Sequence, residues 1–125
     1  MKPLLYSLLL VVFIFRADAQ KASKYVNGKY TGQTKDGKKH GKGTAIYFDG
    51  SAYEGEWVND RRHGIGRAIF KDGSTYYGNW KEDKRDGRGN CEFANGDKYV
   101  GQFVNDEING WGTYTYANGN KFEGE

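Results

Sequence analysis

The sequence predicts an all-β protein: one elongated, single-layer antiparallel sheet of tandem 23-residue β-hairpins, preceded by a signal-peptide helix. Three observations support this prediction: a segment that recurs every 23 residues, a two-residue alternation of side chains within it, and Asp-Gly or Asn-Gly turns between copies. Because each repeat would pack mainly on its neighbours, we expect a thin stack with no enclosed core between two layers.

The first 19 residues differ in composition from the rest of the chain. Lys2 supplies a positive start, residues 4–15 form an apolar run, and Ala17-Asp18-Ala19 offers small residues at a cleavage position. We interpret residues 1–19 as a signal peptide, because the apolar run is shorter than the roughly 20 residues that a membrane-spanning helix needs. The alternative is an uncleaved N-terminal anchor. The sequence therefore predicts an exported chain, secreted or periplasmic, that stays membrane-anchored if this segment is kept.

Residues 20–26 read as a polar lead-in, and residues 27–125 as the repeat array of four units plus the opening strand of a fifth. Each unit opens on a segment of the type Tyr53-Glu54-Gly55-Glu56-Trp57, which recurs at 76–80 and 99–103. The first unit departs from the pattern, as terminal repeats do, because Thr34 replaces the tryptophan. The last strand either caps the sheet or belongs to a longer array.

The second half of each unit carries Gly-x-Gly and then an aromatic residue, before the closing turn. Glycine normally weakens strands, so we expect rings such as Tyr53, Trp57 and Phe70 to lie over Gly64, Gly66 and their equivalents. This structural role is favoured over a ligand-stacking platform. The signature comprises Tyr30, Gly32, Tyr53, Gly55, Trp57, Gly64, Gly66, Phe70, Tyr76, Gly78, Trp80, Gly87, Gly89, Phe93, Tyr99, Gly101, Phe103, Gly110, Gly112 and Tyr116.

The pattern Tyr-x-Gly-x-Trp followed by Gly-x-Gly resembles the MORN repeat, the "membrane occupation and recognition nexus" family. The resemblance covers about four-fifths of the chain. It implies an elongated, twisted sheet of hairpins that serves as a scaffold, a membrane-proximal adaptor or an accessory module beside a catalytic domain. Family members include parts of phosphatidylinositol-phosphate kinases and a class of lysine methyltransferase, whereas residues 1–125 predict a signal peptide and the repeat array alone.

No catalytic or metal-binding pattern accompanies the repeat, so we expect no enzyme activity, cofactor or metal. His40 and His63 share one repeat position, which later units fill with other polar residues, so ordinary turn residues are favoured over a metal site. Cys91 is the single cysteine and fits a small apolar strand position. The net charge of +3 is too small to predict nucleic-acid binding.

Six cations recur where each hairpin is expected to turn. If the hairpins stack in register, they line one edge of the sheet and could contact phosphate head groups or another acidic surface. Solvated turns, partly neutralised by Asp60 and Asp83, are favoured over such a contact. The six residues are Lys38, Lys39, Arg61, Arg62, Lys84 and Arg85.

Together these features predict an exported, non-enzymatic scaffold or binding module with a protein or an anionic membrane surface as its partner. Exposed strands at the two ends of the sheet make end-to-end self-association a further prediction. The alternative is a regulatory or targeting fragment of a larger enzyme, related to the lipid kinases or methyltransferases by family analogy alone.

Overall fold

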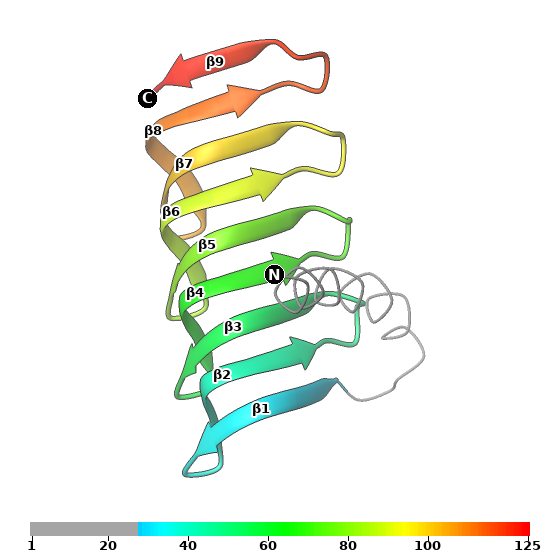
Figure 1. The fold of residues 1–125 in the computed structure, drawn as a ribbon, viewed down its shortest axis with the longest axis vertical. Helices are drawn as coiled ribbons and strands as arrows, with labels where there is room; N and C mark the ends of the chain where they lie inside the picture. Colours follow the sequence, from blue (N-terminus) through cyan, green and yellow to red (C-terminus); the bar gives the residue numbers. More distant parts are fainter. Residues whose placement is uncertain (1–27) are drawn as a thin grey trace, which may run out of the picture.

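The structure is a computed structural model that describes residues 28–125, so the predicted signal peptide and lead-in lie outside the described residues. Within this range all regular elements are strands of one antiparallel sheet, ordered β1 to β9 as in the chain (Figure 1). The described part holds no helix that is long and apolar enough to cross a membrane. The strands are β1 (Lys29–Lys35), β2 (Lys38–Ile46), β3 (Ala52–Val58), β4 (Arg61–Ile69), β5 (Thr75–Lys81), β6 (Lys84–Glu92), β7 (Lys98–Val104), β8 (Glu107–Thr115) and β9 (Lys121–Gly124). The predicted fold class is confirmed.

The hairpin turns inside the repeats are shorter than the sequence suggested. Asn59 and Asp60 form the whole connection between β3 and β4, with φ angles of 49° and 69°. Two successive positive φ values define the tight turn whose twist matches that of paired strands. The expectation that Arg61 and Arg62 lie in the turn was wrong, because both are strand residues of β4.

The connections between repeats follow the prediction. Asp72-Gly73 turns the chain from β4 into β5, and Gly73 has a φ of 91° that favours glycine. The Phe70 amide donates to the Ser74 carbonyl at 2.8 Å, and the Asp72 carboxylate accepts from the Ser74 amide at 2.8 Å. The turn therefore uses the Asp72 side-chain oxygen as an acceptor and the glycine for its positive φ.

A bulge in the second strand of each hairpin changes the direction of one predicted glycine. Gly55 pairs with Gly66 and Trp57 with Arg62, so Glu56 lies opposite three residues of β4. A Cβ atom added at Gly64 would meet the Glu56 side chain, on the side of the sheet away from the rings. The expectation that a ring covers Gly64 was wrong, because simple alternation does not hold through the bulge.

One glycine from each of the nine strands lies in a single row across the sheet. Register pairs join each member to the next, for example Gly43 to Gly55 and Gly55 to Gly66. The row is Gly32, Gly43, Gly55, Gly66, Gly78, Gly89, Gly101, Gly112 and Gly124. It forms a bare strip of backbone along the long axis of the molecule.

Candidate binding surfaces

Four tyrosine rings cover the glycine row on one side of the sheet, which we call the ring face. A Cβ atom at Gly66 would clash with the Tyr53 ring, and one at Gly55 would lie 2.7 Å from the Tyr53 hydroxyl oxygen. The Tyr53 hydroxyl donates to the Glu56 carbonyl at 2.8 Å, which fixes the ring over the backbone. Tyr30, Tyr76 and Tyr99 lie in the same way over Gly43, Gly89 and Gly112.

Each tyrosine covers glycines of its own hairpin, whereas the tryptophans join successive hairpins. Trp57 Nε1 donates to the Gly43 carbonyl at 3.0 Å, and Trp80 Nε1 donates to the Gly66 carbonyl at 3.1 Å. Tyrosine atoms lie nearest to the Cβ positions of Gly43, Gly66, Gly89 and Gly112, so the predicted covering role belongs mainly to the tyrosines, and Trp57 reaches the Gly43 backbone through Nε1. Phe70 instead packs against the buried core from its margin.

The rings of the ring face form one continuous edge-to-face chain. Neighbouring centroids lie 4.9–5.7 Å apart and their planes cross at 82–89°. Such pairs contribute about 0.5–1.5 kcal/mol beyond the area they bury. In order along the sheet the rings are Tyr30, Trp57, Tyr53, Trp80, Tyr76, Phe103 and Tyr99.

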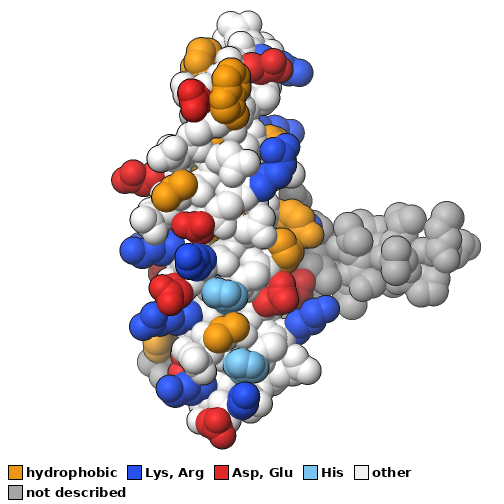
Figure 2. Space-filling model, turned by 90° about the vertical axis from the view of Figure 1, so that its left-hand side faces the viewer, with side chains coloured by type: hydrophobic (Ala, Val, Ile, Leu, Met, Phe, Trp, Pro, Cys, Tyr) orange, Lys and Arg blue, Asp and Glu red, His pale blue; other side chains and the backbone are white. Residues whose placement is uncertain are grey.

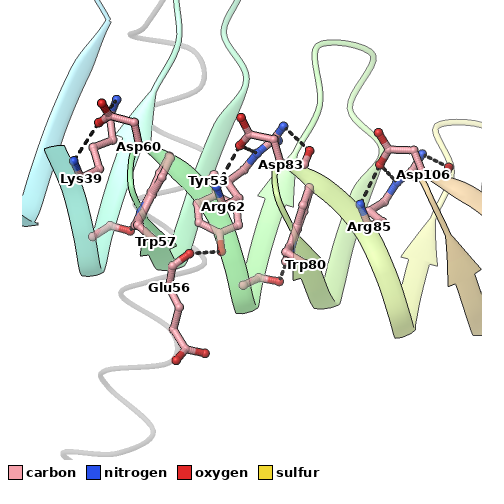
Figure 3. A network of polar contacts seen from close by, with 12 residues as sticks. Lys39, Tyr53, Glu56, Trp57, Asp60, Arg62, Trp80, Asp83, Arg85 and Asp106 are labelled. Carbon is pink, nitrogen blue, oxygen red and sulfur yellow. Dashed lines mark hydrogen bonds and ion pairs between the residues drawn. The ribbon is translucent and has the colours of Figure 1, made fainter.

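A cation from each of the first three units covers these rings and is held by an aspartate from the next unit (Figure 3). The Arg62 guanidinium lies 4.6 Å from the Trp80 ring, and its Nε donates to Asp83 Oδ1 at 3.0 Å. The same carboxylate oxygen accepts from the Arg62 amide at 2.8 Å, while the Asp83 amide donates to the Arg62 carbonyl at 3.0 Å. Arg85 pairs with Asp106 in the same geometry, and Lys39 Nζ lies 3.8 Å from Asp60 Oδ1.

Burial and hydrogen bonds set the pKa values on and beside the ring face. Burial raises the pKa of Tyr76 to about 12 and that of Tyr53 still further, so both hydroxyls stay protonated donors. Asp97 accepts from the Tyr114 hydroxyl and the Ala117 amide, both at 2.8 Å. The hydrogen bond from Tyr114 is the main reason that the pKa of Asp97 is lowered.

The opposite side of the sheet, which we call the solvent face, carries side chains that do not pack between repeats. Ile65, Tyr77, Val100 and Trp111 are all exposed there, and Tyr77 retains 50% of its surface. An open groove of about 810 Å³ crosses β1 to β5 on this face, with Lys42, Glu54, Glu56 and Arg67 among its walls. Lys42 is registered opposite Glu56, and Glu54 opposite Arg67, so its charges alternate in sign.

The structure separates the six predicted cations into two sets of three. Lys39, Arg62 and Arg85 lie on the ring face in the aspartate pairs, whereas Lys38, Arg61 and Lys84 are exposed on the solvent face. Asp60 and Asp83 therefore pair with the preceding unit, not with the cations that follow them in sequence. We use the name tip row for the exposed cations beside the hairpin turns: Lys35, Lys38, Arg61, Lys81 and Lys84.

The tip row has no carboxylate partner within 4.0 Å among residues 28–125. Lys35 is registered directly opposite Lys38, and Lys81 directly opposite Lys84. Like charges that face each other across a strand pair are destabilising. Figure 2 looks onto the edge formed by the hairpin turns, where Lys and Arg side chains are concentrated over the lower strands and alternate with acidic ones.

The described residues contain no cluster of three potential metal ligands. His40 and His63 are both partly buried in the bulged strands, and His40 Nδ1 is buried with no hydrogen-bond partner in the described structure. Cys91 is buried beneath the rings, where burial raises the pKa of its thiol. These surroundings are those of packing residues, and none of these side chains forms a nucleophile–base pair.

The comparison with family models identifies the repeat. The MORN repeat model matches residues 30–52, 53–75, 76–98 and 99–121, so this chain belongs to the MORN repeat family. A search of curated proteins finds no match. MORN repeats are generally non-catalytic modules that bind proteins or membrane lipids, which places the chain among binding or scaffold modules.

Sequence reasoning missed the links between units. The partners Lys39 and Asp60 are 21 residues apart, as are Arg62 and Asp83. This spacing recurs in each of the first three units, so a search for opposite charges at a constant separation would have found it. The bulge left a signal too: the polar residue facing it is Gln33, Glu56, Asn79 or Gln102.

Proposed function

We propose that this chain is an exported, non-enzymatic MORN-repeat binding module whose working surface is the solvent face of the sheet. The observation that supports this proposal is the division of the cations. On the ring face the cations, rings and aspartates contact one another and hold the repeats together. The tip row is exposed and has no carboxylate partner in residues 28–125. Surface charge that does not stabilise a fold is available to bind an oppositely charged partner.

The partner we propose is anionic: an acidic protein surface or the head groups of a membrane. Juxtaposed cations bind such surfaces with about 1 kcal/mol each, in a salt-dependent way. Tip-row residues on β1 to β6 would then contact the partner together, because they lie at the same end of the strands. Export of the chain is part of this proposal and rests on the composition of residues 1–19.

The structure changes which variant tests the proposal. Reversing Arg62 or Arg85 would break the aspartate pairs and confuse loss of binding with loss of folding. The informative variant is Lys38→Glu with Arg61→Glu and Lys84→Glu, since these side chains are exposed and have no partner to lose within the described part. We expect it to lose binding to vesicles that contain anionic lipid, or to a captured acidic partner.

A control variant reverses the same number of charges at positions outside the tip row. Lys29→Glu with Lys71→Glu and Lys121→Glu alters three exposed lysines away from the tip row. We expect this control to retain most of the binding measured by co-sedimentation. Equal binding by both variants and the unaltered chain would refute the tip row as the working surface.

A further inference from the structure

The tip row is a line of charge, not a patch. Its five cations occupy the same end of β1, β2, β4, β5 and β6, and Val58 fills the corresponding place on β3. Neighbouring strands are about 4.8 Å apart, so the row extends over about 24 Å from Lys35 to Lys84. The backbone fixes the Cα positions from which these side chains extend, because each residue lies in a paired strand.

Carboxylates border this line on the outer side. The hairpin turns place Asp36 next to Lys35 and Glu82 next to Lys81, and both acids are exposed. Asp60 is exposed at the turn between them. A flat anionic surface that approached the edge of the sheet would therefore meet these turn carboxylates together with the cations.

Charge on the inner side is compensated over β2 to β4. Lys42 is registered opposite Glu56, and Glu54 is registered opposite Arg67. On β6 the exposed Arg88 is registered opposite Gln102 and has no acidic residue across from it. A flat surface laid on the solvent face would cover both glutamates, whereas a partner as narrow as the row would avoid them. The charge distribution therefore fits a thin chain better than a plane.

We propose that the tip row binds a linear acidic polysaccharide, whose sulfate or carboxylate groups lie along the row across β1 to β6. This inference rests on the part of the proposed function that makes the tip row the working surface for an anionic partner, and it takes a polysaccharide as that partner in place of a protein or a membrane. A stiff acidic polymer presents its charges along a line, as the cations of the tip row do. It also loses little conformational freedom on binding, which favours affinity. A single-stranded nucleic acid fits less well, because it needs aromatic rings for stacking and the row carries Val58 between its cations.

The test measures binding of sulfated oligosaccharides of increasing length to the full chain by calorimetry. We expect affinity to rise with length and to level off once the oligosaccharide spans about 24 Å. Lys38→Gln with Arg61→Gln and Lys84→Gln should weaken binding at least tenfold at 0.1 M salt. The same variant should reduce the slope of log affinity against log salt by about two to three, since three ionic contacts are lost.

A control variant tests whether the location of the removed charge matters. Lys29→Gln with Lys71→Gln and Lys121→Gln removes the same charge elsewhere and should change affinity less than twofold. Circular dichroism and thermal melting should be unaltered in both variants. Equal weakening by the two variants would overturn the inference, as would affinity that shows no plateau with length in the unaltered chain.

Two other probes complete the test. Vesicles of phosphatidylserine and phosphatidylcholine, and a polyglutamate peptide, are measured beside the oligosaccharides. Tip-row-dependent binding to either one, with no binding to the oligosaccharides, would reject the polysaccharide and keep the proposed function. An absence of binding to all three probes would reject both.

Discussion

Arg61 and Arg62 are neighbours in β4, yet their surroundings are opposite. Arg62 covers the Trp80 ring and is paired with Asp83, so it belongs to the packing between repeats. Arg61 points to the solvent face, is exposed, and has no acidic partner within residues 28–125. The alternation of a β-strand thus places one of two identical side chains in the packing between repeats and the other in solvent.

The same division separates the two faces of the whole sheet. On the ring face the fold uses bare glycine backbone, tyrosine rings, cations and aspartates in successive layers. The solvent face retains exposed apolar and basic side chains that a single-layer sheet does not bury. A single-layer sheet therefore buries side chains on one face only, and the side chains of its other face stay in contact with solvent.

The largest effect is expected where the ring face has no spare volume. Gly66→Ala would place a methyl group against the Tyr53 ring, and we expect a loss of about 2–3 kcal/mol in the free energy of unfolding. Ile65→Ala, one residue away on the solvent face, should cost less than about 1 kcal/mol because Ile65 is 43% exposed. Urea unfolding measures both, and similar losses would show that the glycine row is not closely covered.

Two adjacent tyrosines give a smaller contrast. Tyr76→Phe removes the hydroxyl that donates to the Asn79 carbonyl at 2.7 Å in a buried site, and we expect a loss of about 1 kcal/mol. Tyr77→Phe removes a hydroxyl from a side chain that is 50% exposed, and should leave stability unchanged within about 0.5 kcal/mol. Thermal unfolding of the two variants distinguishes them, and a larger loss in the Tyr77 variant would reverse the assignment of the faces.

The smallest expected effect is a change in acid sensitivity. The pKa of Asp97 is lowered in the folded chain, mainly by the Tyr114 hydrogen bond, so ionised Asp97 stabilises the fold above its unfolded pKa. That stabilisation is lost as pH falls through the lower folded pKa. Asp97→Asn should therefore show a weaker loss of stability than the unaltered chain when the pH is lowered below about 4. Parallel pH profiles would contradict this account.

Much of the fold could be predicted from the sequence because the local pattern within each repeat determines its strands and turns. The Tyr-x-Gly-x-Trp segment alternates with period two, and Asp72-Gly73 supplies the turn, so strands and connections followed directly. The bulge at Gly64 did not follow, because a register shift depends on the pairing with β3 and not on the pattern within β4. A prediction from alternation fails at the residue where alternation is interrupted.

The candidate surface was predicted in part. The sequence placed six cations along one edge, and the structure showed that three of them lie on the ring face. Their aspartate partners come from the next unit, so the pairing depends on how units stack and not on neighbours in the chain. Export, the identity of the partner and end-to-end self-association stay predictions.

The unfolding free energies of Arg61→Gln and Arg62→Gln test the division between the faces most directly. Arg62→Gln loses an ion pair, hydrogen bonds to the next turn and contact with the Trp80 ring, and we expect a loss of about 1–2 kcal/mol at this partly exposed site. Arg61→Gln should stay within about 0.5 kcal/mol of the unaltered chain. Equal losses, or a larger loss for Arg61→Gln, would contradict the account.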